Sequence, residues 1–334
     1  MTEKMRNFFK QSMLIPKPTF TEDTLPDQNG RVFIVTGGYT GVGLYLCKIL
    51  YQKHGTVYIA GRDKEKYGKA VDFIKDAFKE SKGRLEFLHL DLASLKSVKA
   101  AATEFMGKER RLDVLTNNAG VMFPPKGSKT EDSYRKNQGY ELTMGTNCVG
   151  PYLFTQLLRP LLNKTAASSP PGTVRVTWAA SLAIDTLAPN YGVDFDEKGV
   201  PKIHGIQTDY GQSKAANVFL GTEYARRYSK DGVLSVSWNP GNLKTELYRH
   251  LGDIQGSIAP LFLFPADIGA YVELYAGWSP DITAENNGAL VIPWGRLHTP
   301  RSQLLEAIKS KKDGGMGVAE QFWDWCDQQV KAHL

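Results

Sequence analysis

A short stretch near the start of the chain, VFIVTGGYTGVG at 32–43, constrains the fold most strongly. Its first four residues form an apolar run typical of a strand buried on both faces. Four glycines follow this run: Gly37, Gly38, Gly41 and Gly43. A helical pattern begins directly after them, so backbone N–H groups and a helix dipole point toward the turn, where a phosphate can approach the glycines closely. The stretch predicts a phosphate-binding turn, with a purely connecting turn as the alternative.

The same alternation continues along the chain. Further strands are predicted at 56–60, 85–90, 112–116, 173–179, 233–238 and 289–292, with helical patterns between most of them. Asp63 and Ser94 are expected to cap two of these helices, one running to about Lys82. Other helices are predicted from Asn147 to about Leu162 and from Tyr210 to Lys230. Right-handed crossovers between such strands predict an α/β fold, a doubly wound, Rossmann-like parallel sheet of about seven strands with helices on both faces.

We expect an N-terminal extension at 1–29 and a single domain at 30–334. Within the extension, Met5, Phe9 and Met13 recur at helical spacing beside Phe8, which predicts a short amphipathic helix. Packing of this helix on the main domain is the favoured interpretation, and contact with a membrane surface or a second copy is the alternative. Irregular, substrate-covering insertions are expected near 124–139, 182–209 and 243–264.

Composition excludes several classes of protein. The formal net charge of +6 is spread along the chain and suits an anionic small ligand, and no nucleic-acid-binding motif occurs. The three cysteines have no metal-like spacing, so no metal site is predicted and reduced thiols inside a cell are expected. Pro260, Pro265 and Asp267 interrupt the apolar region at 258–278, which argues against a membrane-spanning segment. A cytoplasmic location is expected, with the peroxisome as a minor alternative because the chain ends in Ala-His-Leu.

A second landmark is formed by Ser181, Tyr210 and Lys214. Tyr210 and Lys214 are four residues apart and therefore share one face of a helix. A phenol titrates near ~10 in water, and a lysine ammonium a few ångströms away lowers that pKa. The pair is a reasonable acid/base unit, although such pairs are also common on solvated helix faces. All these features follow strands, so they are expected at the edge where open α/β sheets bind ligands.

The whole pattern resembles the short-chain dehydrogenase/reductase family from about residue 30 to 292. The motifs that carry the resemblance are Thr36-Gly37-x-x-x-Gly41-x-Gly43, Asp91-Leu92, Asn118-Ala119-Gly120, Asn147, Ser181, Tyr210-x-x-x-Lys214 and Pro240-Gly241-x-x-x-Thr245. The long separation of Ser181 from Tyr210 is similar to that in the retinol-dehydrogenase-like branch and in fungal reductases of that kind. The family commonly pairs through its helices, so a homodimer stays open, although the tail after Ile292 could cover that surface.

The resemblance implies a role for each motif. Ser181 would hydrogen-bond the substrate carbonyl, and Tyr210 would deliver the proton. Lys214 would hold the nicotinamide ribose and lower the pKa of Tyr210, while Asn147 would bend its helix and order a water that connects Lys214 to solvent. The implied cofactor-binding residues are Thr36, Gly37, Tyr39, Thr40, Gly41, Val42, Gly43, Arg62, Asp91, Leu92, Asn118, Ala119, Gly120, Tyr210, Lys214, Pro240, Gly241, Leu243 and Thr245.

The segment after the second predicted strand indicates the cofactor. Sites specific for NAD normally place an acid at this point, whereas the sequence reads Ala60-Gly61-Arg62. Arg62 can form a bidentate contact with a 2′-phosphate. Asp63 is the counter-argument, but it lies one residue later and is expected to cap the next helix. We therefore predict NADP(H).

The segments expected to close the pocket are rich in apolar residues. These are Met122, Phe123, Pro124, Leu182, Ile184, Leu187, Tyr191, Leu247, Tyr248, Ile258, Leu261, Phe262 and Phe264. Such a pocket, polar only at Ser181 and Tyr210, favours a bulky lipophilic ketone or alcohol that is retinoid- or steroid-like, terpenoid or an aromatic polyketide. Two alternatives are the reduction of an imine or enone, or epimerisation, at the same cofactor site, and a non-catalytic nucleotide-binding regulator. The sequence leaves the direction of hydride transfer open.

Overall fold

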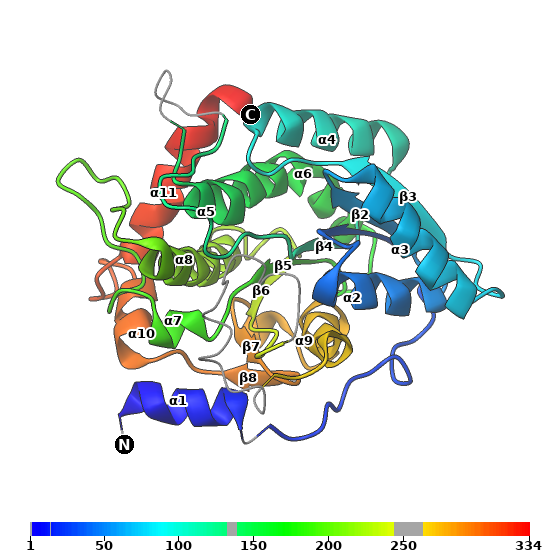
Figure 1. Cartoon of the computed structure of the whole chain (residues 1–334), viewed down its shortest axis with the longest axis horizontal. Helices are drawn as coiled ribbons and strands as arrows, with labels where there is room; N and C mark the ends of the chain where they lie inside the picture. Colours follow the sequence, from blue (N-terminus) through cyan, green and yellow to red (C-terminus); the bar gives the residue numbers. More distant parts are fainter. Residues whose placement is uncertain (1, 14, 132–138, 244–262) are drawn as a thin grey trace.

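An eight-stranded sheet lies at the centre of the computed structural model (Figure 1). The structure describes residues 2–13, 15–131, 139–243 and 263–334. The strands are β1 (Val32–Thr36), β2 (Thr56–Gly61), β3 (Arg84–His89), β4 (Val114–Asn117), β5 (Arg175–Ala179), β6 (Leu234–Trp238), β7 (Leu290–Ile292) and β8 (Arg296–His298). Their order across the sheet is β3-β2-β1-β4-β5-β6-β7-β8. The first seven run parallel, which confirms the predicted doubly wound sheet.

The eighth strand corrects the predicted count of about seven. β8 pairs antiparallel with β7, with Leu290 opposite His298. It is three residues long and reads Arg-Leu-His, with none of its residues buried. No apolar run or alternation marks such a segment, so periodicity could not identify it.

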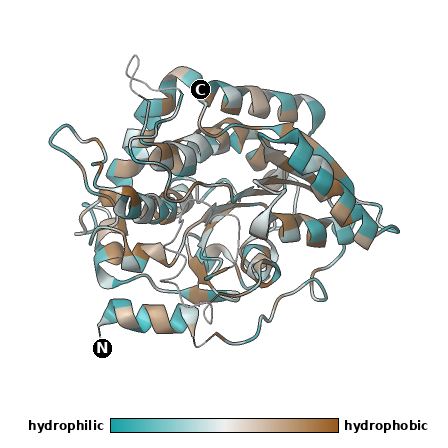
Figure 2. Cartoon of the chain, viewed as in Figure 1, coloured by the Kyte–Doolittle hydropathy of each residue, from teal (hydrophilic) through white to brown (hydrophobic). Residues whose placement is uncertain are grey.

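Helices cover both faces of the sheet, as predicted. One face carries α2 (Gly41–Gln52), α3 (Lys64–Ala77) and α9 (Ala266–Trp278), and the other carries α4 (Leu95–Lys108), α6 (Gly150–Ala167), α8 (Ile206–Arg227) and α11 (Val318–Val330). β1, β4, β5 and β6 lie between these layers and are buried along their whole length. Figure 2 shows the polar residues on the outward side of helices such as α3. The order of strands reverses between β1 and β4, which opens a crevice at their carboxyl ends.

The caps predicted for two helices are confirmed. Asp63 precedes α3, and its Oδ1 accepts hydrogen bonds from the backbone N–H groups of Glu65 and Lys66, at 3.0 and 2.9 Å. Ser94 precedes α4 and accepts from the N–H of Ser97. The helix predicted to run to Lys82 ends earlier, at Ala77. Phe78, which packs against the core, is the C-cap in a non-helical conformation, and the following Lys-Glu-Ser-Lys offers no apolar side chain that would continue the helix.

Two predictions around the site were wrong in detail. The segment 182–209 is not irregular throughout, because it contains α7 (Ala183–Thr186) and the first turn of α8, which begins at Ile206 rather than Tyr210. The helix predicted from Asn147 begins earlier, as α5 (Leu142–Met144), and continues through a π-helical segment, η1 (Gly145–Val149), into α6. Single-turn π segments carry no signature in apolar spacing and occur often at functional sites.

The N-terminal helix exists, but its orientation is the reverse of what its pattern indicates. α1 spans Glu3–Ser12 and packs beside α7 (Figure 1). Its buried residues are the polar Asn7, Gln11 and Ser12, whereas Met5 and Met13 are 50% and 48% exposed. Packing on the main domain is therefore confirmed, but through the polar face instead of the apolar stripe.

The chain after β8 covers the outer side of α8 and α6. It contains α10 (Ser302–Ile308) and then α11, which ends in the short turn η6 (Lys331–His333). Trp323 of α11 makes an edge contact with the ring of Tyr152 on α6, with 4.9 Å between the ring centroids. Arg227 of α8 bonds Asp324 at 2.8 Å. The tail therefore occupies a helical surface that the sequence left open for pairing.

Candidate active site

The glycine turn lies between β1 and α2 at the crevice. Gly37 and Gly41 have φ values of +66° and +56°, in the left-handed region that glycine adopts without strain. The Thr40 side chain makes no capping bond to α2, which starts at Gly41. The first N–H groups of this helix therefore stay available to an anion.

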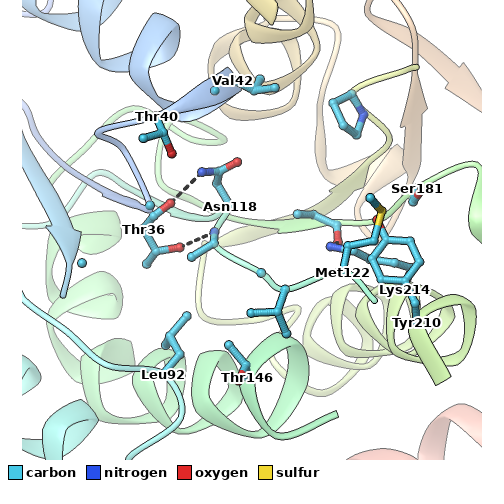
Figure 3. A pocket seen from close by; sticks show the side chains of 18 of the residues that line it. Thr36, Thr40, Val42, Leu92, Asn118, Met122, Thr146, Ser181, Tyr210 and Lys214 are labelled. Atoms are coloured by element: carbon cyan, nitrogen blue, oxygen red, sulfur yellow. Dashed lines mark hydrogen bonds between the residues drawn. The ribbon is translucent and has the colours of Figure 1, made fainter. Parts of the chain in front are cut away.

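The turn is braced by the segment after β4. Asn118 Nδ2 donates to the carbonyl of Thr36 at 2.7 Å, and the N–H of Ala119 donates to Thr36 Oγ1 at 2.9 Å (Figure 3). A methyl group at Gly43 would lie 2.5 Å from Asn118 Nδ2. Glycine is required there because a side chain would push Asn118 out of its bond.

The end of β2 has an aromatic neighbour. The ring of Tyr39 lies so close to Gly61 that a methyl group there would be 2.2 Å from it, and the Tyr39 hydroxyl accepts from the N–H of Arg62 at 3.3 Å. The Arg62 side chain is 61% exposed, and its Nη1 lies 3.6 Å from Asp91 Oδ2. Among the described residues, this cation at the border of the crevice is held by a loose surface ion pair.

Tyr210 and Lys214 lie one turn apart in the stretch of α8 that is buried all round. Lys214 Nζ donates to the carbonyl of Ala179, the last residue of β5, at 3.0 Å, and lies 5.7 Å from the centroid of the Tyr210 ring. Burial lowers the pKa of Lys214 to about 8, because desolvation disfavours the ammonium. Ser181 follows β5, and its Oγ accepts from the N–H of Ala183 at 3.2 Å.

Asn147 lies behind this pair, inside the π-helical segment. Its side chain accepts from the N–H of Val121 at 2.8 Å and donates to the carbonyl of Val121 at 3.1 Å and to Ser213 Oγ at 3.0 Å. A methyl group at Gly120 would lie 3.0 Å from Asn147 Oδ1 and 3.5 Å from Lys214 Nζ. Gly120 therefore keeps open the short space between the Asn147 amide and the lysine.

Two residues of this network escaped the sequence analysis. Ser213 Oγ donates to the carbonyl of Tyr210 at 2.8 Å and accepts from Asn147, so it links the tyrosine's helix to the π segment. Asn217 Nδ2 donates at 2.8 Å to the same Ala179 carbonyl that Lys214 contacts. The only available signal was position, because Asn217 follows Lys214 by three residues and so shares its helix face.

One cavity of about 1530 Å³ unites these parts. It is lined by nearly all the predicted site residues, including Arg62, Asn118, Ser181, Tyr210 and Lys214. The predicted residues that line it further are Thr36, Gly37, Tyr39, Thr40, Gly41, Val42, Asp91, Leu92, Ala119, Gly120, Pro240, Gly241 and Leu243. Gly43 and Asn147 stand behind the lining and support it. Thr245 lies outside the described residues.

The apolar end of the cavity covers Tyr210. Met122, Ala183 and Tyr210 form a small buried cluster, with Phe123 and Leu187 packed against it. The Phe123 ring meets the Tyr210 ring edge-on at 5.3 Å, and Phe123 has a φ of +51°, a strained value for this residue. Such strain persists only where the surroundings impose it, and it often marks functional positions.

Not every predicted apolar residue reaches the cavity. Met122, Phe123, Pro124, Leu182 and Leu187 line it. Ile184 instead packs into the main core, and Tyr191 is 39% exposed at the surface. Phe264 bridges to Leu243, which joins the two ends of the third predicted insertion. Leu247, Tyr248, Ile258, Leu261 and Phe262 lie outside the described residues.

Within the described ranges, no group of three or more His, Cys, Asp or Glu residues could hold a metal ion. In the same ranges, no helix combines the length and apolar character needed to span a bilayer.

Comparisons with known proteins agree with this geometry. The family model described as short chain dehydrogenase matches residues 31–174. A curated short-chain dehydrogenase/reductase, bet4 of Neocamarosporium betae, is 44% identical over 96% of this chain and 92% of its own. An oxidoreductase of Schizosaccharomyces pombe, C736.13, is 39% identical over 85% of this chain and 83% of its own.

Solved structures show the same fold. An uncharacterized protein from Mycobacterium paratuberculosis superposes with a TM-score of 0.64 at 25% identity, covering 92% of this chain and 96% of its own. An NADPH-bound carbonyl reductase from chicken fatty liver superposes with a TM-score of 0.58 at 21% identity, covering 81% of this chain and all of its own.

The sheet, the glycine turn and the curated relatives together define a nucleotide-binding oxidoreductase. The chain belongs to the short-chain dehydrogenase/reductase family.

Proposed function

We propose that this enzyme uses NADP(H) to interconvert a ketone or aldehyde with an alcohol on a bulky lipophilic substrate. One observation carries the proposal. A buried tyrosine and lysine, Tyr210 and Lys214, line the same cavity as the glycine turn and are covered there by apolar side chains. An acid/base pair between a nucleotide site and an apolar pocket suits hydride transfer to a lipophilic carbonyl.

The residues on the cofactor side fit a dinucleotide. Gly37 and Gly41 hold the left-handed backbone of a phosphate-binding turn, and the uncapped start of α2 offers N–H groups to the pyrophosphate. Asp91 and Leu92 would border the adenine, and Lys214 would contact the nicotinamide ribose. Pro240, Gly241 and Leu243 line the opposite side, and a contact from Thr245 stays a prediction. When bound, the nicotinamide supplies or accepts the hydride.

The chain's own groups would handle the proton. Tyr210 would give its hydroxyl proton to the carbonyl oxygen during reduction and take it back during oxidation. The neighbouring Lys214 charge stabilises the phenolate left behind. Ser181 would hold the carbonyl oxygen in place. Asn147, beside Gly120 and behind Lys214, would order a water molecule that returns a proton to the lysine.

Arg62 supports NADP(H) over NAD(H). It lies at the end of β2 and is largely exposed, so its guanidinium can turn from Asp91 to a 2′-phosphate with little cost. Lys64 and Lys66 line the same part of the cavity. The carboxylate of Asp63 bonds two N–H groups of α3, which leaves it poorly placed to bind ribose hydroxyls.

The test is a reaction panel with one matched pair of variants. NADPH oxidation is followed with methyl ketones, acetonaphthone, an enone and an imine. In Tyr210→Phe the ring stays and the transferable proton is lost, so ketone turnover should fall by about 100-fold or more while NADPH affinity persists. Tyr228→Phe, which removes a hydroxyl bonded to Gln156 at the far end of α8, is the control and should behave as wild type.

Undiminished ketone turnover in Tyr210→Phe contradicts the assignment of the proton donor. If the enzyme turns over the enone or the imine but none of the ketones, the alternative reaction at the same cofactor site is supported instead. Binding of NADPH without turnover of any compound supports a non-catalytic role.

A further inference from the structure

The polar face of α1 bonds the two segments that follow β5 and β6. Gln11 Nε2 donates to Asp185 Oδ2 on α7 at 3.3 Å, and Gln11 Oε1 accepts from Asn239 Nδ2 at 2.8 Å. The next residue, Ser12, accepts through its Oγ from Asn242 Nδ2 at 3.0 Å. Gln11, Asp185 and Asn239 are all buried, so these bonds are shielded from water and stronger than surface ones.

Both partner segments carry residues of the candidate site. Asp185 comes four residues after Ser181, and Asn239 and Asn242 flank Pro240 and Gly241. One N-terminal helix therefore ties together the segments that follow β5 and β6.

The chain after β8 fastens the same loop from the other side. Arg301 is completely buried, and its guanidinium donates to the carbonyls of Ile184, Pro189 and Asn190, with Nε 3.7 Å from Asp185 Oδ1. Glu3, at the start of α1, accepts from Ser302 Oγ at 2.9 Å. Helix α1 is thus held at both ends and is a fixed part of the site region.

Phe8 is the residue by which this helix reaches the cavity. It is half-buried and lines the cavity together with Ala183, Thr186 and Leu187 of the α7 region. Its neighbour Phe9 is absent from the lining. The aromatic ring of Phe8 therefore extends the apolar surface that begins at the Tyr210 cluster.

We propose that α1 closes the substrate end of the cavity and that Phe8 determines how strongly the enzyme holds long or bulky substrates. This rests on the proposed function. Apolar contact grows with the surface removed from water, so only a substrate long enough to reach α1 gains from the Phe8 ring. A short carbonyl compound binds near Ser181 and Tyr210 and does not reach it.

The experiment compares Phe8→Ala with Met5→Ala. Met5 is on the same helix, is 50% exposed and lies outside the cavity lining, so its variant controls for general disturbance of α1. KM and kcat are measured with methyl ketones from butanone to decanone and with acetonaphthone. We expect Phe8→Ala to raise KM for decanone and acetonaphthone about tenfold, with kcat and the butanone KM unchanged, and Met5→Ala to match wild type.

A second readout is independent of turnover. Decanol cannot react with NADPH, so calorimetry on the NADPH-saturated protein measures its binding directly. Phe8→Ala should weaken decanol binding by about the same factor, and Phe8→Leu, which keeps a large apolar side chain, should fall between the two. Phe8→Leu also carries the test if the alanine variant does not fold.

The outcomes separate the two proposals. The role of Phe8 is overturned if Phe8→Ala and Phe8→Leu both bind decanol as tightly as wild type and show the wild-type KM for long ketones. The proposal is also overturned if Phe8→Ala raises the KM for butanone as much as that for decanone, or if Met5→Ala shows the same effect. Either result would mean that α1 only supports the fold of the site. If the wild type turns over no carbonyl compound, the proposed function fails, whereas loss of decanol binding still supports Phe8.

Discussion

The cofactor half and the substrate half of the cavity are built in different ways. The cofactor half consists largely of backbone turns and small residues that follow the parallel strands, where Asn118 bonds the carbonyl of Thr36 and leaves no room for a side chain at Gly43. The substrate half is assembled from segments far apart in the chain, since Phe8, Met122 and Leu187 reach it from three separate elements. Binding of the nucleotide is therefore expected to depend on backbone fit, and binding of the substrate on side-chain surface.

The largest effect is expected from a substitution at Gly43, which should weaken cofactor binding and leave substrate binding unchanged. In Gly43→Ala the new methyl group displaces Asn118 from Thr36 and deforms the turn. NADPH affinity, measured by fluorescence titration, should fall about 100-fold, equivalent to about 2.8 kcal/mol. KM for acetonaphthone at saturating NADPH should stay near wild type, because the substrate half does not contact Gly43.

Gly68→Ala is the matched control for that change. Gly68 lies within α3, and a methyl group there would have no neighbour within 4 Å. Alanine should leave NADPH affinity unchanged and stabilise the helix by about 0.5–1 kcal/mol. Equal NADPH affinity in Gly43→Ala and Gly68→Ala would show that the turn does not depend on backbone fit.

A smaller effect is expected from pH, at the lysine that joins the two halves. The pKa of Lys214 is lowered by burial to about 8, so its ammonium loses its proton above that pH. Because the charge is needed beside Tyr210, kcat/KM for NADPH should fall about tenfold per pH unit on the alkaline side. Lys214→Arg, whose guanidinium stays charged, should move this fall to higher pH.

The same shift has a consequence for stability. In the unfolded chain a lysine titrates near 10.5, so between about pH 8 and 10.5 the unfolded state binds more protons than the folded state. The free energy of unfolding, measured by chemical denaturation, should therefore rise with pH over this window through Lys214. The activity prediction has its own contrary outcome. If kcat/KM for NADPH stays constant between about pH 8 and 10.5, a charged lysine does not take part in the reaction.

The smallest effect concerns a side chain within the cofactor half. Arg62→Ala should weaken NADPH binding about tenfold and leave NADH binding unchanged, because only the 2′-phosphate loses its partner. Arg110→Ala, at the end of α4, is the control, since Arg110 bonds only the nearby carbonyl of Met106 among the described residues. An equal loss for both nucleotides assigns Arg62 to folding of the crevice rather than to cofactor choice.

The difference between the halves also explains what the sequence could predict. The β1 strand, its glycine turn and α2 form a contiguous unit whose conformation follows from local residue types, and the structure agrees with it. The caps Asp63 and Ser94 are likewise local and were confirmed. The π segment around Asn147 was missed, and the packing face of α1 was the reverse of the one that its pattern indicated, because both depend on residues far away in the chain.

Two residues show how distant partners decide the outcome. The spacing of Met5, Phe9 and Met13 indicated an apolar face on α1. The polar Gln11 instead bonds Asp185 and Asn239, more than 170 positions away, and the helix turns its polar face inward. Asn147 was predicted at the start of a helix that it would bend, and the structure places it in a π segment where its amide bonds Val121. Neither hydrophobic spacing nor propensity contains the identity of such partners.

The two edges of the sheet are protected against self-association through strand pairing. An exposed strand edge invites a second chain to add on, and charged side chains discourage this. At one edge, β3 presents Arg84 paired with Glu86; at the other, Arg296 of β8 reaches across to the carbonyl of Lys10 in α1. Charges at one edge and a helix beside the other oppose strand-by-strand aggregation. Any ordered self-association is therefore expected to use helical faces, and those of α6 and α8 are already covered in part by α11.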